Sequence, residues 1–449
     1  MTGFQSLEAR AALGGVFAVL GYFAASSPAI HRGSQRTFDR AVNAAFILTR
    51  FSLYITTFFI LGLPMRGDIP SYYLAEAHDV LRHMLPYRDF GSSYAPLHPF
   101  LDAALLFLWH SPLVMPLFAI LVECFILPVW LRVSRLFCAE PVVRIAAVLY
   151  VASPISAQFV TVDGQDNVVI ALLLGLAVLA LARNRAVLSG VLVACGAVFV
   201  KFLPLLFVPA FFLPVARRFR WLAGFLATLL LGYGYFALRH LPLLYPVAFE
   251  HGLRSANNLP YLVEGIFNLA PSVAVEDGVL ALVLLAVVGL IARAVLRRTQ
   301  SNRDAGTAIV FRVIIFGCVA LNLALIFLSK KSWPPYLVLT LFPMCLLLGH
   351  RRRFRLRLAC FAFFNLIALT ASSIWATVFR HFPATAFHQS LVAGGTGVYV
   401  FLFAQTALIV GYAWLFLESL AAMQLDGPGL VSETGDFARP WHSIESEFG

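Results

Sequence analysis

Residues 279–296 read VLALVLLAVVGLIARAVL, a continuous apolar run with a single charge, Arg293, near its end. A run of this length approaches the roughly 20 residues that a helix needs to cross the hydrocarbon core of a bilayer. Its apolar residues do not alternate with polar ones as in a membrane β-strand, which favours a helix. Thirteen such segments recur along the chain. They lie near residues 11–30, 44–64, 112–131, 142–160, 168–183, 187–200, 203–215, 221–238, 279–296, 307–328, 336–349, 358–377 and 397–418.

The composition also indicates that lipid surrounds much of the chain. Of the 449 residues, 60% are hydrophobic and 12% are charged, with a mean hydropathy of +0.84, whereas a soluble protein carries about 25% charged residues. The six cysteines stand singly with no CxxC pair, so neither a zinc site nor a disulfide framework is indicated. The net charge of +11 is spread over short loops, which fits membrane orientation better than nucleic-acid binding. We predict an all-α polytopic membrane protein with about 13 transmembrane helices.

Arginine clusters between the segments predict the orientation of the chain. With thirteen crossings all six clusters fall on one side, which the positive-inside rule makes cytoplasmic. The N-terminus then lies outside, and the chain divides into a transmembrane domain, 1–425, and a polar cytoplasmic tail, 426–449, that we expect to be disordered. The clusters are Arg32/Arg36/Arg40, Arg132/Arg135, Arg183/Arg185, Arg217/Arg218/Arg220, Arg293/Arg297/Arg298/Arg303 and Arg351/Arg352/Arg353/Arg355/Arg357.

Two long loops, about residues 65–111 and 239–278, fall on the predicted outer side. The first contains a helix-compatible stretch, 72–85, and an apolar stretch, 97–109, which is too short to span and is expected to lie as an interfacial helix. Long loops on one face of a rigid bundle commonly carry binding and catalysis. We therefore place the catalytic loop at 65–111.

The first chemical pattern begins where the second apolar segment ends. Residues 66–73 read RGDIPSYY, and residues 86–99 read PYRDFGSSYAPLHP. A carboxylate at a membrane boundary is costly unless it is solvated or paired. Asp68 therefore has a simple explanation, as a partner of Arg66 or a cap of the next helix, and a functional one, because aromatic residues and two short helices surround it.

This layout resembles the GT-C superfamily of membrane glycosyltransferases, and within it glycosyltransferase family 87, a bacterial α-mannosyltransferase-like group. Three stretches carry the resemblance: Gly67–Leu97, against a family pattern of Asp, Tyr, "PY" and "YPP"; Gly164–Asn167, at the start of a span; and Gly190–Pro204, against a small-residue helix ending in "K-x-x-P". The layout covers nearly the whole chain. The sequence departs from the pattern at Ser332–Tyr336, where relatives often carry Ser-Trp followed by histidine and this chain has Pro-Pro-Tyr.

The resemblance implies a GT-C-like bundle with juxtamembrane helices on its outer face. It also implies a polyprenyl-phospho-sugar donor carrying mannose, a glycolipid or glycan acceptor, and a bacterial inner membrane with the active site facing the periplasm. Attack of a hydroxyl on an anomeric carbon needs a base, and one carboxylate suffices for an inverting reaction. Asp68 is the predicted base.

The leaving lipid phosphate needs cations near the bilayer surface. The chain holds three lysines, Lys201, Lys330 and Lys331, and all three fall on the predicted outer side. Lys201 lies between two apolar segments too short to span, so we expect it at a dip in the membrane, whereas the other two are equally explained by snorkelling. We assign these lysines, together with Arg88, to the donor phosphate.

The remaining predicted site residues would contact the sugar or the acceptor: Tyr72, Tyr73, Tyr94, Gln165 and Asp166. Interfacial aromatics are often anchors, and Asp166 has an equal alternative as a helix N-cap. We predict no cofactor and no metal ligand set. A divalent metal is still compatible with the sequence, with Asp79 or Asp89 as a second ligand.

The alternative from another functional class is a transporter or flippase of lipid-linked sugars. Transporters favour internal repeats and ionisable groups near the membrane midplane. Asn322 and Asn365, polar residues in the middle of predicted spans, are the sequence features that favour it.

Overall fold

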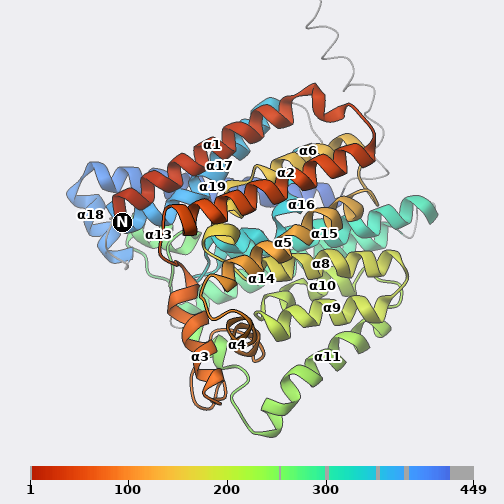
Figure 1. The fold of residues 1–449 in the computed structure, drawn as a ribbon, viewed down its shortest axis with the longest axis horizontal. Coiled ribbons are helices and arrows are strands. Elements are labelled where there is room, and N and C mark those ends of the chain that lie inside the picture. The colour runs from red at the N-terminus through yellow and green to blue at the C-terminus, as the bar shows by residue number, and fades with distance from the viewer. Residues whose placement is uncertain (1–2, 252–253, 299–302, 350–353, 379–383, 425–449) are drawn as a thin grey trace, which may run out of the picture.

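A computed structural model describes residues 3–251, 254–298, 303–349, 354–378 and 384–424. The predicted tail, 426–449, lies outside the described residues. The described residues fold into helices and form no strand, as expected for an all-α membrane protein (Figure 1). The α-helices are α1 Gly3–Ser26, α2 Gln35–Ile55, α3 Leu74–Leu81, α4 His98–Leu108, α5 Val114–Ser134, α6 Glu140–Val151, α7 Pro154–Ser156, α8 Asn167–Ala182, α9 Ala186–Phe199, α10 Val208–Phe212, α11 Arg218–Leu238, α12 Tyr245–His251, α13 Leu259–Phe267, α14 Val273–Arg298, α15 Arg303–Leu328, α16 Leu341–Leu346, α17 Phe354–Val378, α18 Ala384–Ala393 and α19 Thr396–Gln424.

Nine helices of the described chain are long and apolar enough to cross a membrane, so the predicted count of thirteen spans is not confirmed. The other four predicted segments form shorter apolar helices. Two of them begin as a 3₁₀ turn and continue as an α-helix: Leu203–Phe207 leads into α10, and Pro334–Thr340 leads into α16. The nine long helices are Leu7–Ser26, Gln35–Ile60, Val114–Ser134, Glu140–Val162, Arg218–Leu238, Val273–Arg297, Ala308–Leu328, Phe354–Ile374 and Thr396–Gln424.

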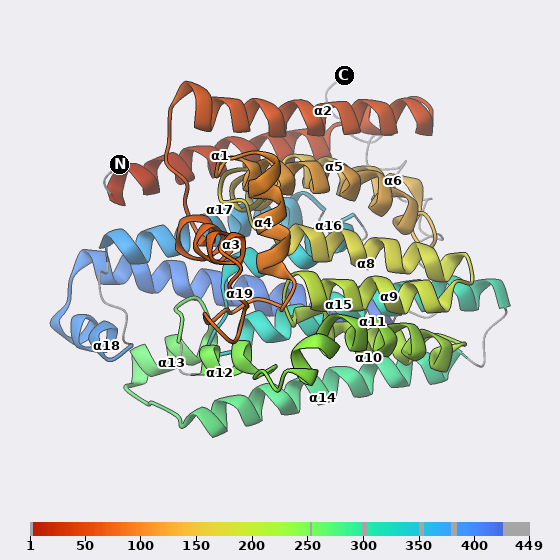
Figure 2. The same cartoon turned by 60° about the horizontal axis from the view of Figure 1, so that its bottom comes forward.

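The long helices lie side by side in one bundle (Figure 2). The turns between α1 and α2, α5 and α6, and α8 and α9, which carry arginine clusters, lie at one end of this bundle. The short helices α3, α13 and α18 lie toward the opposite end, and α4 runs across the bundle instead of along it. The loop that contains Asp68 and α4 is thus placed away from the arginine-bearing turns.

Close packing of α9 against α11 fixes the position of the residues that follow α9. Two glycines permit it: a Cβ at Gly190 would lie 2.0 Å from the carbonyl oxygen of Trp221, and a Cβ at Gly224 would lie 2.3 Å from that of Val187. Small residues let membrane helices approach closely and gain dispersion energy. The indole of Trp221 then donates to Ser189 Oγ at 3.1 Å. This contact secures the helix whose end leads into Lys201.

Candidate functional site

Asp68 lies at a turn made by a glycine. Gly67 has a φ of +64°, a left-handed conformation that glycine adopts without steric cost. The turn brings Asp68 to the start of α8, where Gln165 Nε2 donates to Asp68 Oδ2 at 3.2 Å. Two predicted site residues, 97 positions apart in sequence, therefore meet.

The helix-cap explanation of Asp68 is not supported by this geometry. Asp68 precedes the short helix Ile69–Tyr73, but its side chain makes no capping hydrogen bond. Asp166 likewise precedes α8 without capping it. Both carboxylates are directed to partners in other segments.

Lys201 reaches Asp166 because the loop before α4 pairs with the end of α9. The amides of Ala95 and Leu97 donate to the carbonyls of Val200 and Val198, at 3.1 and 3.2 Å. These two hydrogen bonds set residues 94–97 beside the end of α9 and the residues that lead to Lys201. Lys201 Nζ then donates to Asp166 Oδ1 at 3.0 Å, with only 12% of the lysine side chain exposed.

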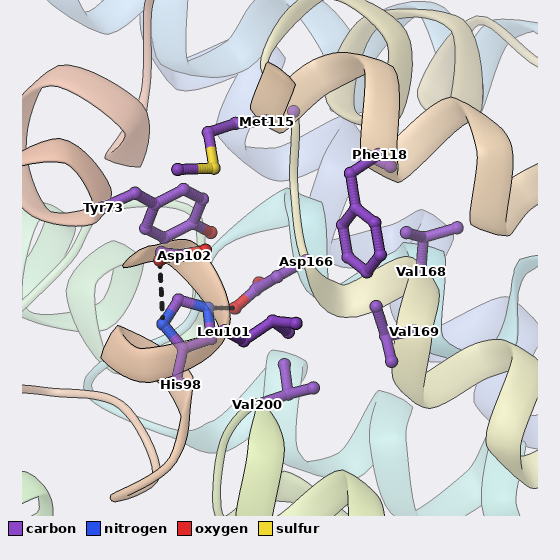
Figure 3. Close-up of a pocket in the computed structure, with 12 residues that line it drawn as sticks. Tyr73, His98, Leu101, Asp102, Met115, Phe118, Asp166, Val168, Val169 and Val200 are labelled. Atoms are coloured by element: carbon purple, nitrogen blue, oxygen red, sulfur yellow. Dashed lines mark ion pairs between the residues drawn. The ribbon is translucent and has the colours of Figure 1, made fainter. Parts of the chain in front are cut away.

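Asp166 continues into a chain of charged groups through His98. His98 Nε2 lies 3.0 Å from Asp166 Oδ2, and His98 Nδ1 lies 3.2 Å from Asp102 Oδ2 (Figure 3). Asp102 follows His98 by four residues on α4, the spacing that places two side chains on one helix face. The result is a continuous line of contacts, Asp102 to His98 to Asp166 to Lys201, that is almost wholly buried.

Burial and the charges of neighbouring groups determine the protonation of these four side chains. Burial alone would raise the pKa of Asp166, but Lys201 and His98 outweigh it and hold that pKa well below its usual range. Burial would lower the pKa of Lys201, yet Asp166 and Asp68 raise it. For His98 the neighbouring Asp102 and Asp166 outweigh burial and raise the pKa, whereas burial raises the pKa of Asp102 to about 7. Among the four charged groups, Asp102 is the one whose pKa burial moves from the acidic range to about 7.

Three tyrosines lie around this line of charged groups, and they differ in their contacts and exposure. The Tyr94 ring stacks on His98 with centroids 4.4 Å apart, and Lys201 Nζ lies 4.8 Å from the Tyr94 centroid. Tyr73 packs against both Tyr94 and His98. Tyr73 and Tyr94 are buried, whereas Tyr72 is 38% exposed. Of the three rings predicted to contact sugar, Tyr72 is the one with an open face.

A further buried carboxylate, Glu76, is bonded to the loop that carries Tyr94. Ser92 Oγ donates to Glu76 Oε2 at 2.8 Å and accepts from the amide of Tyr94 at 3.1 Å. The hydroxyl of Tyr87 donates to the carbonyl oxygen of Tyr94. These bonds fix the loop between α3 and α4, and with it the ring of Tyr94 over Lys201.

Glu76→Gln should flatten the pH dependence of stability. Burial raises the pKa of Glu76 from 4.5 to about 7, against the opposing hydrogen bond from Ser92. Protonated Glu76 makes its full contribution to the free energy of unfolding below 4.5, the pKa of Glu76 in the unfolded chain. This contribution is lost as the pH rises through about 7, the pKa in the folded protein. The difference between the two pKa values corresponds to about 3 kcal/mol at most.

We therefore expect the Tm of the wild type in detergent to fall between about pH 5 and 8, and Glu76→Gln to remove much of the fall. Asp102, whose pKa is raised in the same direction, should sustain the rest. The exposed Glu8 provides the matched control, Glu8→Gln. An equal fall in wild type and Glu76→Gln would contradict the assignment.

Two of the other predicted phosphate ligands, Lys330 and Arg88, pair with carboxylates. Lys330 Nζ donates to Asp277 Oδ2 at 3.0 Å, which ties the loop after α15 to α14. Arg88 makes two hydrogen bonds to the neighbouring Asp89, at 2.9 and 2.8 Å, on an exposed part of the loop. The backbone amide of Lys331 donates to Ser329 Oγ at 3.2 Å. Of the predicted phosphate ligands, Lys201 is the one that these contacts join to the Asp68 side of the molecule.

Several residues of the cluster were not among the predicted site residues. His98, Asp102 and Glu76 belong to it, and the ring of Tyr336 lies 5.9 Å from Lys201 Nζ. The i,i+4 spacing of His98 and Asp102 in the sequence could have indicated that these two side chains lie together on one helix face. Tyr336 follows the Pro-Pro pair at which the sequence differs from the pattern described above. The segment that differs therefore contributes a ring close to Lys201.

A small cavity adjoins the chain of charges. Its volume of about 20 Å³ suits water and not a sugar, so a sugar would have to bind at the more open side of Asp68 and Tyr72. Within the residues that the structure describes, no group of three or more His, Cys, Asp and Glu side chains has a metal-site arrangement. The cavity is lined by Tyr73, His98, Leu101, Asp102, Met115, Phe118, Ala119, Gly164, Asp166, Val168, Val169 and Val200 (Figure 3).

Comparisons with known proteins were made for the whole chain. No protein-family model matches the sequence. No curated protein matches it either.

Proposed function

We propose that the protein is an inverting membrane glycosyltransferase that moves mannose from a polyprenyl-phosphate donor to a hydroxyl of a lipid or glycan acceptor. The observation that carries the proposal is the meeting of Asp68, Gln165, Asp166 and Lys201, which come from three separate stretches of sequence. A half-buried carboxylate and a buried ammonium in one cluster are what this reaction needs: a base and an anion site. The donor lipid, the acceptor and the surrounding membrane lipids are the proposed partners.

The chemical step follows from these positions. The acceptor oxygen forms a bond to the anomeric carbon while the bond from that carbon to the phosphate oxygen breaks. The hydroxyl proton passes to Asp68, and the electron pair of the broken bond leaves with the polyprenyl phosphate. Lys201, held by Asp166, would stabilise the negative charge that develops on that phosphate.

The test is sugar transfer by the purified full-length chain in nanodiscs. Radiolabelled polyprenyl-phosphomannose is supplied with a crude membrane-glycolipid fraction as acceptor, and the product and released polyprenyl phosphate are followed together. Transfer with inversion at the anomeric carbon supports the proposal. Binding of the donor without release of polyprenyl phosphate, under any acceptor tested, would contradict an enzymatic function.

Sidedness is a part of the proposal that can be checked separately. We propose that the end of the bundle carrying α3 and the Asp68 loop is periplasmic and that the arginine-bearing turns are cytoplasmic. In a Cys360→Ser background, Arg82→Cys should react with an impermeant maleimide from the periplasmic side, and Arg183→Cys only after the membrane is opened. Arg82 and Arg183 are both exposed, and Cys360 is the exposed native cysteine. Labelling of both variants from one side would refute this orientation.

A transporter or flippase of lipid-linked sugars is the second candidate, and a buried ion pair favours it. Arg50 on α2 and Glu123 on α5 are fully buried, with Arg50 Nε 3.6 Å from Glu123 Oε2. Tyr150 donates to Glu123 at 2.9 Å, and Arg50 donates to Ser156 at 2.8 Å. Ionisable groups within membrane spans often mark transport pathways. Movement of a lipid-linked sugar across proteoliposomes without transfer, lost in the double variant Arg50→Gln and Glu123→Gln, would favour this candidate over the enzyme.

A further inference from the structure

We propose that His98 is a positioning residue for the donor phosphate: it holds a proton between Asp102 and Asp166 and so keeps Asp166 against Lys201. The inference deepens the proposed function and depends on it. Its geometric basis is the unbroken line of contacts at 3.2, 3.0 and 3.0 Å from Asp102 to Lys201. His98 reaches the phosphate only through Asp166 and Lys201.

Both ring nitrogens of His98 have carboxylate partners, and this determines its state. A neutral imidazole has one N–H donor and would leave one carboxylate facing a lone pair. With a proton on each nitrogen, His98 is a cation that pairs with both carboxylates, 3.2 Å from Asp102 Oδ2 and 3.0 Å from Asp166 Oδ2. The raised pKa of His98, in which the two aspartates outweigh burial, agrees with the protonated form. Asp166 is then held from one side by His98 and offers its other oxygen to Lys201.

The ring of His98 is also fixed in orientation. It lies between Tyr94, stacked 4.4 Å away at 16°, and Tyr73, whose centroid is 5.1 Å away. Only 1% of His98 is exposed. A ring clamped in this way can pass orientation to Asp166, as outer-shell groups orient ligands in other sites. A phosphate oxygen would then use the N–H groups of Lys201 that Asp166 leaves free.

The net charge of this four-residue cluster changes when Asp102 gains or loses its proton. With Asp102 ionised, His98 and Lys201 balance the two aspartates; with Asp102 protonated, the four groups carry a net charge of about +1. A polyprenyl-phospho-sugar is a phosphodiester with no proton to lose near neutral pH, so a pH dependence of its binding belongs to the protein. The charged and titratable groups facing His98 and Asp102 from neighbouring elements are Asp68, Tyr73, Glu76, Tyr94, Asp166 and Lys201.

The experiment measures donor KM, kcat and Tm for His98→Phe, His98→Gln and Asp102→Asn. His98→Phe keeps the aromatic stack but removes both donors, and we expect a rise in donor KM of about tenfold, corresponding to the loss of one charge-assisted hydrogen bond. His98→Gln retains one donor, toward Asp166, and should recover part of that affinity. In all three variants kcat should change less than KM. His110→Phe, at an exposed histidine just beyond α4, is the matched control.

The pH profile separates positioning from simple packing. Wild-type donor KM should rise severalfold between about pH 6 and 8 as Asp102 ionises. Asp102→Asn should remove this rise and keep the low-pH KM. A loss of Tm in the His98 variants with unchanged KM, or a wild-type profile retained by Asp102→Asn, would overturn the inference. A wild type that neither binds nor uses the donor would contradict the proposed function itself, whereas a wild type that uses the donor with variants of unchanged KM would contradict only the role of His98.

Discussion

Asp68→Asn should reduce sugar transfer by ~10²–10⁴-fold, or about 3–5 kcal/mol of activation free energy, while donor binding stays near wild type. The amide has the shape of the carboxylate but cannot take the acceptor proton. It can still accept the hydrogen bond that Gln165 Nε2 makes to Asp68 Oδ2 at 3.2 Å. The loss should therefore appear in kcat, with little change in donor KM or Tm.

Asp89→Asn is the matched control, because Asp89 lies in the same loop, 65–111, and has a local structural function. Its carboxylate accepts from the amide of Leu85 at 2.7 Å and from Arg88. We expect a small fall in Tm and transfer within a few-fold of wild type. Near wild-type transfer by a well-folded Asp68→Asn protein would remove Asp68 as the base. Parallel losses of activity and Tm would instead return Asp68 to a structural role.

The sequence was sufficient for the helices whose apolar runs are long. Residues 279–296 lie inside α14, and the run near 397–418 lies inside α19. It was not sufficient for the number of spans, because hydropathy does not show where a segment changes direction. Residues 203–215 read as one apolar segment, yet in the structure this stretch consists of the 3₁₀ turn Leu203–Phe207 followed by the short helix α10, Val208–Phe212. The mean hydropathy of the segment gives no sign of this change in backbone conformation.

For the site, sequence reasoning reached the residues with an unusual type or position. Asp68 and Lys201 stood out as charges at the ends of apolar segments, and they meet in one cluster with Gln165 and Asp166. His98 was not among the predicted site residues. Its role depends on the pairing of residues 95–97 with 198–200, a contact between distant segments with no local signature. The same holds for Tyr336.

The two polar residues that favoured a transporter have local partners instead. Asn322 donates to the carbonyl of Tyr336 at 3.0 Å and to Thr340 at 2.9 Å. Asn365 donates to the carbonyl of Phe361, one turn earlier in its own helix. The buried ion pair that bears on that alternative, Arg50 with Glu123, was not predicted, because a single arginine and a single glutamate on different spans have no visible relation in sequence.

Lys201→Met should weaken binding of the donor phosphate by about 10–100-fold, the range expected for a lost hydrogen bond to a charged group. Methionine fills a similar volume without the ammonium. Lys201→Arg retains the charge and should lose less, although the planar guanidinium does not reproduce the geometry of a point charge. Affinity is measured with polyprenyl phosphate and with the sugar-bearing donor, in nanodiscs at fixed ionic strength.

Lys201→Met also leaves Asp166 without its cation, so stability must be separated from binding. Removing one partner of a buried ion pair costs about 3–5 kcal/mol, because the remaining charge stays buried. Asp166 keeps its contact with His98 at 3.0 Å, which should limit the loss. The double variant Lys201→Met with Asp166→Asn removes both charges and should recover most of the Tm. If donor affinity recovers with the Tm, Lys201 serves the fold; if the Tm returns and the affinity does not, the ammonium itself binds the phosphate.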